Sequence, residues 1–204
     1  MATFTELLKP IKIKSMELRN RMCMPPMHTK FATESGEMTE RMIQYYVERA
    51  KGGVALIVLE NTCVDWEVGR AAGTPIRIDK DIYTTGLHDL VEAVHRYGAK
   101  IATQPHHSGR QNTMVNTEGN QPPVAPSPVA CKKCVDMPRP VTEEEIEKII
   151  DEHVQAARRT KMAGFDAVQV HGAHGYILYQ FTSPYTNKRT DRFGGDLDNR
   201  IFVP

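Results

Sequence analysis

The spacing of hydrophobic positions changes along the chain, and each spacing predicts a different element. Residues 54–59 form a continuous apolar run, which is the pattern of a strand buried on both faces of a parallel sheet. Shorter runs and alternating stretches predict the other strands, which cover residues 11–14 and 16–18 as a hairpin, 21–27, 100–104 and 166–170.

Three segments with helical spacing of apolar residues lie between these strands. They cover residues 40–51, residues 82–97 and the segment from Thr142 to Gly164. Thr39 suits the N-cap of the first helix, and a capping box from Thr142 to Glu145 opens the third. Residues 106–141 are rich in Pro, Gly, Asn and Ser, and a loop of this length inside a compact domain is usually functional or disordered.

The alternation of strands and helices predicts an α/β fold with right-handed crossovers. The sequence has no GxGxxG after the first strand and no GxxxxGK[ST], which disfavours a Rossmann dinucleotide domain and a P-loop enzyme. A doubly wound sheet is still an alternative, but a (β/α)8 TIM barrel is preferred. A complete barrel needs roughly 250 residues and eight strands. We therefore expect residues 1–204 to be the truncated N-terminal part of one barrel domain, with about four βα units. Unpaired sheet edges in such a part would favour a homo-oligomer.

Polar residues follow each predicted strand of the main sheet. They are residues 26–29, residues 60–62, Gln104 and His171. Ligands of these folds bind at the carboxyl ends of the strands. Amides and imidazoles at all four places therefore favour an active site over a loop that is polar only for solubility. The segment HGAHGYILYQF after the last strand also supplies His174 and Tyr176.

Composition and charge limit the classes of partner. The net charge is +1, 40% of the residues are hydrophobic, and no Lys/Arg run exceeds two residues. Neither nucleic acid nor a membrane surface is therefore expected as a partner. No run reaches the roughly 18 apolar residues of a membrane span, and the amino terminus lacks a signal-peptide core, so we expect a cytoplasmic protein.

The four cysteines are too few for a disulfide scaffold. Cys23 and Cys63 lie in apolar, strand-like runs, which predicts buried thiols. Cys131 and Cys134 form a lone CxxC motif. A structural zinc site needs about four ligands, so we expect no metal here but loop thiols that can be oxidised.

Four blocks of sequence resemble the Old Yellow Enzyme family of FMN-dependent oxidoreductases, which fold as (β/α)8 barrels. They are residues 18–21 with 26–27; residues 45–46, 49–53 and 60; residues 104, 107 and 109–110; and residues 171–176, 180–181, 183–184, 187, 189–191, 194–195 and 199–200. The resemblance covers essentially the whole chain. Residues 27–29 look most like the 2,4-dienoyl-CoA reductase and bile-acid-inducible enoate reductase branch. The iron–sulfur cluster and FAD of that branch would lie in regions beyond this chain.

The resemblance implies an ene-reductase that uses NADH or NADPH to reduce the C=C bond of a small enoyl or enone substrate. Five residues would line the FMN by family position, namely Pro26, Met27, His28, Asn61 and Gln104. His171 and His174 would donate hydrogen bonds to the carbonyl oxygen of the substrate. Tyr176 would be the proton donor, since an unperturbed tyrosine, with a pKa of about 10, stays protonated near neutrality.

Several alternatives are open for single residues. His28 could instead be a buried imidazole bonded to the backbone. His107 fits the family pattern, whereas His106 reads as a plain loop residue, and Pro105 stands where the family usually has leucine. Four residues are expected to pin the last loop by ion pairs and hydrogen bonds rather than to touch substrate, and these are Asn187, Arg189, Asp191 and Arg200.

Two alternatives concern the function as a whole. The first is a non-catalytic half-barrel without flavin. The second is an amine oxidoreductase similar to trimethylamine dehydrogenase, which attaches its flavin through a cysteine in the loop after the first strand. Residues 27–29 are Met, His and Thr, which argues against a covalent flavin of that kind.

Overall fold

A parallel sheet forms the centre of the protein. The structure, a computed structural model, describes residues 4–204. The strands of the sheet run in the order β3–β4–β6–β9, with β5 beside the end of β4. They are β3 (Cys23–Met24), β4 (Leu56–Cys63), β5 (Ile76–Arg77), β6 (Lys100–His106) and β9 (Ala167–Val168). Two small sheets pair β1 (Ile11–Ile13) with β2 (Met16–Leu18) and β7 (Val124–Ala125) with β8 (Arg139–Pro140).

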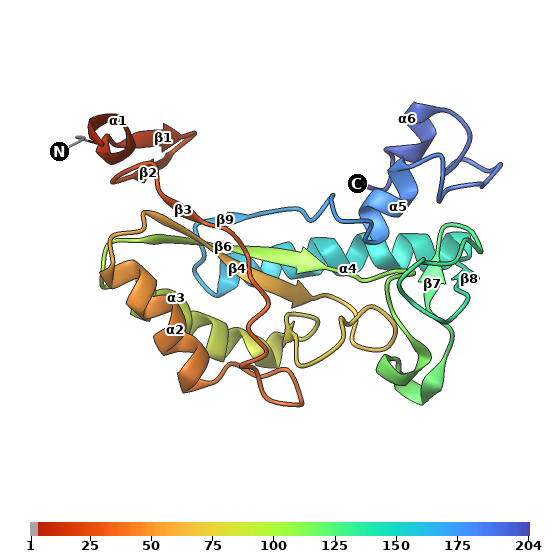
Figure 1. The fold of residues 1–204 in the computed structure, drawn as a ribbon, viewed down its shortest axis with the longest axis horizontal. Helices are drawn as coiled ribbons and strands as arrows, with labels where there is room; N and C mark the ends of the chain where they lie inside the picture. The colour runs from red at the N-terminus through yellow and green to blue at the C-terminus, as the bar shows by residue number, and fades with distance from the viewer. Residues whose placement is uncertain (1–3) are drawn as a thin grey trace.

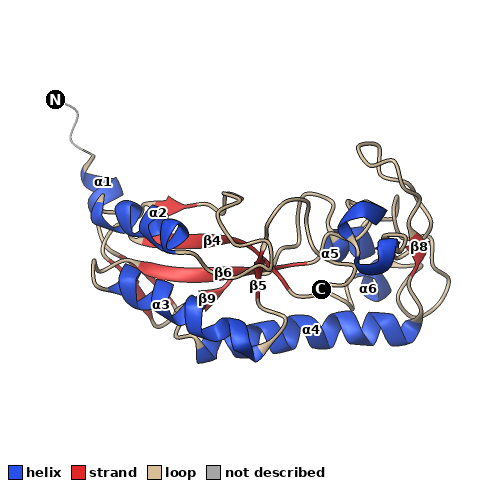
Figure 2. Cartoon of the chain, turned by 90° about the horizontal axis from the view of Figure 1, so that it is seen from below, coloured by secondary structure: helices blue, strands red, loops and turns tan. Residues whose placement is uncertain are grey.

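Three long helices lie along the sheet (Figures 1 and 2). They are α2 (Glu40–Lys51), α3 (Thr84–His95) and α4 (Glu143–Met162). The shorter helices are α1 (Thr5–Leu8), α5 (Ile177–Thr182) and α6 (Leu197–Arg200), with 3-10 turns η1 (Asp81–Tyr83), η2 (Met114–Asn116) and η3 (Glu118–Asn120). Within residues 4–204 no helix combines the length and apolar character that crossing a membrane requires.

The main core lies between the sheet and helices α2 and α3. It is built from fully buried side chains of both layers, including Met42, Tyr46, Ile57, Leu59, Leu87, Leu90, Val94 and Ile101. Burying one such side chain stabilises a fold by about 1.5–3 kcal/mol. This burial explains why residues 54–59 are continuously apolar.

The predicted α/β class and the two helix starts are confirmed. Thr39 Oγ1 accepts a hydrogen bond from the Met42 N–H (3.2 Å), and α2 has the predicted bounds. Thr142 and Glu145 form the predicted capping box, with bonds of 2.9 and 3.2 Å. Both caps satisfy N–H groups that the first helical turn leaves without partners.

Other expectations about strands are wrong in detail. The predicted strand 21–27 is only the edge strand β3, and Cys23 on it is exposed, although Cys63 is fully buried as expected. The predicted strand 166–170 pairs only over Ala167–Val168. By contrast, β4 and β6 run further than predicted, because residues 60–63 and 105–106 continue the parallel pairing.

The two ends of the sheet carry different segments. In Figure 1 the arrowheads of β4 and β6 point toward the end of the molecule that holds β7, β8 and α5, whereas the β1–β2 hairpin lies at the opposite end. The long loop after β6 and the segment after β9 therefore meet at the carboxyl ends of the strands. This is the end at which α/β folds bind ligands.

Candidate active site

Three side-chain amides lie in a row across the carboxyl ends of the central strands. Asn61 of β4 is paired in register with Gln104 of β6. The Gln104 Nε2 donates a hydrogen bond to Oε1 of Gln169 (2.7 Å), which follows β9. Asn61 is half-buried, Gln104 is buried and Gln169 is exposed. The row therefore presents donors and acceptors together to whatever covers this end of the sheet.

Glu60 is a buried carboxylate beside the loop that follows β3. It accepts a hydrogen bond from the Thr29 N–H (2.8 Å) and lies 3.3 Å from the Tyr46 hydroxyl and 3.8 Å from His28 Nε2. Burial raises the pKa of Glu60, and the bonds from Thr29 and the charge of His28 oppose that rise. Burial and the charge of Glu60 also raise the pKa of Tyr46. The sequence places Glu60 in a motif and at the end of a strand, but it predicts none of these contacts.

His28 lies in the loop after β3, with its ring beside the Glu60 carboxylate. Its Nε2 is buried and has no hydrogen-bond partner within residues 4–204. The alternative of a ring bonded to the backbone is therefore not met at Nε2. Met27 beside it is 58% exposed, and Pro26 is half-buried. The loop after β3 thus offers an exposed apolar side chain next to an imidazole whose Nε2 faces the Glu60 carboxylate at 3.8 Å.

A group of side chains with aromatic rings follows β9. The ring centroids of His171 and His174 are 5.1 Å apart, and the Tyr176 ring lies 4.9 Å from His171 with the two planes nearly perpendicular. His171 is buried, Tyr176 is half-buried and His174 is exposed. The structure therefore brings together all three residues that the sequence selected from this segment.

The backbone of the turn explains this convergence. His174 and Gly175 have positive φ angles of 56° and 78°. The positive φ at position 175 favours glycine, and a side chain there would also have to displace Nε2 of Gln111, 2.7 Å from its Cβ. Gln111 Nε2 in turn donates to the His174 carbonyl, and Gln180 Nε2 donates to the Gly175 carbonyl at 2.8 Å. The turn is thus held on both sides.

His106 belongs to this aromatic group, which corrects the expectation that it is a plain loop residue. It ends β6 and is 1% exposed, with its ring 4.3 Å from that of Tyr176. Burial holds the pKa of His106 well below its usual value, and the neighbouring histidines lower it further. Its two ring nitrogens have no partner within residues 4–204. The sequence predicts that the strand ends at Gln104, before Pro105. It therefore does not predict that His106 lies in the strand and beside Tyr176.

Burial also sets the protonation of the other members. Burial and the neighbouring His174 lower the pKa of His171. Burial and the nearby Cys134 raise the pKa of Tyr176. Near neutral pH the site therefore holds a neutral His171, which has one N–H to donate, and a protonated tyrosine.

His107 points away from this group. Its Nδ1 accepts a hydrogen bond from the Gly109 N–H (3.0 Å), and its Nε2 lies 3.5 Å from Asp65. The residues expected to pin the last loop make bonds within it and to the segments beside β7 and β8. Arg189 pairs with Asp191 and also donates to the carbonyls of Val141 (2.6 Å) and Pro126 (3.3 Å). Asn187 donates to the carbonyls of Phe181 and Phe193, and Arg200 donates to the Thr182 carbonyl.

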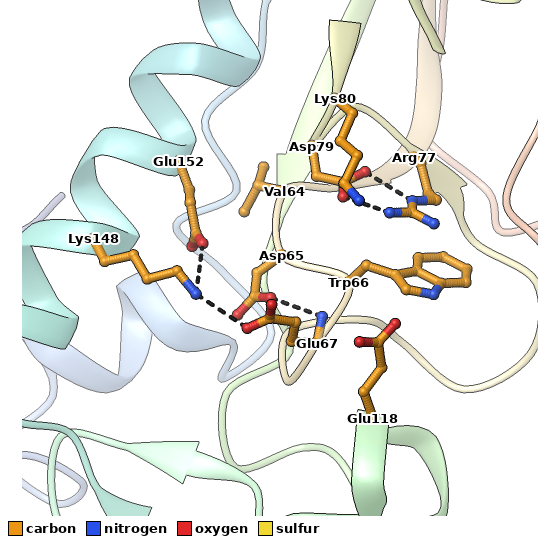
Figure 3. A pocket seen from close by; sticks show the side chains of 10 residues that line it. All are labelled: Val64, Asp65, Trp66, Glu67, Arg77, Asp79, Lys80, Glu118, Lys148 and Glu152. Atoms are coloured by element: carbon orange, nitrogen blue, oxygen red, sulfur yellow. Dashed lines mark hydrogen bonds and ion pairs between the residues drawn. The ribbon is translucent and has the colours of Figure 1, made fainter. Parts of the chain in front are cut away.

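A separate pocket lies between the loop after β4 and helix α4 (Figure 3). Lys148 Nζ is 3.3 Å from Glu67 and 3.4 Å from Glu152, and Arg77 pairs with Asp79 at 2.7 Å. Lys148 and Arg77 thus each already lie beside a carboxyl group. Among the residues that the structure describes, no group of three or more His, Cys, Asp or Glu side chains is arranged to hold a metal ion.

Comparison with known proteins gives a consistent result. The model of the NADH:flavin oxidoreductase / NADH oxidase family matches residues 6–203. The NADH oxidase of Thermoanaerobacter brockii is 50% identical over 204 residues, which are 100% of this chain and 31% of that protein. The NADPH dehydrogenase of Clostridium acetobutylicum is 38% identical over 96% of this chain and 56% of its own length. The chain thus spans between about a third and just over half of these relatives.

Solved structures agree with the sequence comparison. Morphinone reductase superposes with a TM-score of 0.92 at 32% identity, over 97% of this chain and 56% of that one. Old Yellow Enzyme from Pichia sp. AKU4542 gives a TM-score of 0.88 at 33% identity, over 97% and 54%. The expected fold class, a TIM barrel to which this chain contributes the first strands and helices, is confirmed.

Proposed function

The chain belongs to the NADH:flavin oxidoreductase / NADH oxidase family, and on this premise we propose that it forms part of an FMN-dependent ene-reductase. The substrate is a small α,β-unsaturated carbonyl compound whose C=C bond is reduced. The observation that carries this proposal is the convergence of His171, His174 and Tyr176 at the carboxyl end of the sheet.

The residues at this end of the sheet fit a flavin. The amide row of Asn61 and Gln104 offers donors and acceptors to a pyrimidine-like ring edge, and His28 lies in the neighbouring loop with its Nε2 3.8 Å from Glu60. Pro26 and Met27 would cover one face of the ring with apolar atoms. When bound, FMN would take a hydride from NADH or NADPH and deliver it to the β-carbon of the substrate.

The aromatic group after β9 would handle the substrate. Negative charge develops on the carbonyl oxygen as the double bond is reduced, and N–H groups of His171 and His174 would donate hydrogen bonds to it. Tyr176 would give its proton to the α-carbon. The raised pKa of Tyr176 keeps that proton in place near neutral pH. His106 packs edge-on against Tyr176 and would position the phenol ring.

Three further features remain proposals. The electron donor is NADH or NADPH, in line with the names of the relatives. An iron–sulfur cluster and FAD, if the protein has those of the dienoyl-CoA reductase branch, would be held by regions outside this chain. A cytoplasmic location stays a prediction from the sequence.

The test is oxidation of NADH or NADPH by the purified protein with FMN, without oxygen. We expect 2-cyclohexenone to accelerate oxidation and the saturated cyclohexanone to have no effect. The non-catalytic alternative predicts neither flavin binding nor any effect of the enone. A trimethylamine-dehydrogenase-like enzyme would instead reduce its flavin with an amine.

A further inference from the structure

Cys131 and Cys134 lie at the two ends of one tight turn in the loop between β7 and β8. The Cys134 N–H donates a hydrogen bond to the Cys131 carbonyl (3.4 Å), which closes a four-residue turn. The Cα atoms at the ends of such a turn lie within about 7 Å of each other. A disulfide bond requires about 4.4–6.8 Å, so the two residues can be joined with little movement of the backbone. Both thiols are free.

The two thiols are not equivalent. Burial opposes ionisation of Cys131, but hydrogen bonds from the Lys133 N–H (3.4 Å) and from Cys134, with the charge of Arg110, lower its pKa overall. Burial and the hydrogen bond to Cys131 raise the pKa of Cys134 to about 11. The pair therefore loses its first proton from Cys131 and keeps its second on Cys134. Thiol–disulfide exchange needs this division between an attacking thiolate and a resolving thiol.

Arg110 fixes the turn and links it to the candidate active site. Its Nη1 donates to the carbonyls of Val129 (3.2 Å) and Ala130 (3.0 Å), directly before Cys131. The Arg110 N–H donates to Gln180 Oε1 (3.2 Å), and Gln180 also holds the turn that precedes Tyr176. The loop of Cys131 and the turn before Tyr176 are thus linked through the hydrogen bond between Arg110 and Gln180.

We propose that Cys131 and Cys134 form a thiol–disulfide exchange site whose substrate is a low-molecular-weight disulfide. Cys131 is only 8% exposed, which leaves little room for a disulfide held in another folded protein. The site goes beyond the proposed ene-reductase function and needs no flavin.

The reaction balances without a further oxidant. The Cys131 thiolate attacks one sulfur of the substrate disulfide, breaks its S–S bond and releases one thiol, which takes up a proton. Cys134 then gives up its proton and attacks Cys131 Sγ, which releases the second thiol and forms the Cys131–Cys134 disulfide. One disulfide is reduced to two thiols, and two protein thiols are oxidised.

The experiment uses 2-hydroxyethyl disulfide as the probe. The exposed Cys23 would form its own adduct, so every protein carries Cys23→Ser. Released thiol and intact mass are followed with time. We expect this background protein to release two equivalents of thiol and to end as an internal disulfide without adduct. Cys134→Ser should release one equivalent and keep one adduct on Cys131.

Cys131→Ser should react more slowly than Cys134→Ser, because burial, which this substitution leaves in place, still raises the pKa of Cys134. A peptide of residues 128–137 is the control for a damaged fold, and we expect the protein to react faster than this peptide. Equal rates for both single variants, or adducts on the background protein without an internal disulfide, would overturn the proposal. So would a protein no faster than the peptide.

Discussion

Replacing Glu152 by glutamine should make the stability of the protein less dependent on pH. Glu152 lies on α4 in the pocket of Figure 3, with its side chain 17% exposed and its Oε2 without a hydrogen-bond partner in the described residues. Burial first, and then the neighbouring Asp65, raise the pKa of Glu152 to about 8, although Lys148 opposes the rise. The folded protein therefore holds a proton that the unfolded chain releases.

The sign and the size follow from this difference. An ordinary glutamate has a pKa of 4.5, so between that value and about 8 the unfolded state binds fewer protons, and stability falls as pH rises. Above about pH 8 the cost reaches at most about 5 kcal/mol, because each pKa unit corresponds to about 1.4 kcal/mol. Glutamine has the shape of the protonated acid and does not ionise. Glu152→Gln should thus resemble the wild type near about pH 5 and be more stable by up to a few kcal/mol near about pH 8.5.

Urea unfolding at a series of pH values measures this effect. Trp66 is the single tryptophan and lines the same pocket, so its fluorescence reports the transition. Asp151→Asn is the matched control, because Asp151 is the exposed neighbour on α4 and should change stability by less than about 0.5 kcal/mol. Parallel pH profiles for wild type and Glu152→Gln would refute the reasoning, since Glu152 would then ionise as it does in the unfolded chain.

Two further predictions follow from the site and the sheet. His171→Ala and His174→Ala should each weaken binding of phenolate ligands, which imitate the charged carbonyl oxygen, by about tenfold or more in a difference-spectrum titration of the FMN-loaded protein. Loss of a bound metal with unchanged phenolate binding would point instead to a metal site. Self-association is expected because β9 is an edge strand and exposes Val168, with the exposed Val170 just after it. Light scattering that finds only monomer would contradict this expectation.

The sequence predicted the parts of the fold that depend on local patterns. Helix α4 begins where the Thr142 capping box places it, and consecutive residues Ile57, Val58 and Leu59 are buried because both faces of β4 are covered. The length of β9 could not be read in this way. Its residues are apolar, but pairing with β6 stops after Val168, and this depends on the neighbouring strand.

The sequence predicted the site residues that belong to one motif and did not predict those that tertiary packing brings to the site. His171, His174 and Tyr176 stand within six residues, so one turn could bring them together. His106 joins them only because β6 continues through Pro105. A proline usually indicates that a strand ends, so the sequence does not predict this continuation. Glu60 meets Tyr46 only because α2 packs on β4, a contact that no spacing in the sequence encodes.

We propose that Tyr176 protonates the substrate of a flavin-dependent ene-reductase. The direct measurement is stopped-flow reoxidation of the reduced, FMN-loaded protein by 2-cyclohexenone without oxygen, comparing Tyr176→Phe with Tyr179→Phe. Tyr179 is the exposed tyrosine on the next helical turn and serves as the matched control.

Loss of a general acid typically slows a reaction by about 10²–10⁴-fold. We therefore predict that Tyr176→Phe slows reoxidation to that extent, that Tyr179→Phe leaves it unchanged, and that both variants are reduced by NADH or NADPH at the wild-type rate. Reoxidation of Tyr176→Phe at the wild-type rate would contradict the account.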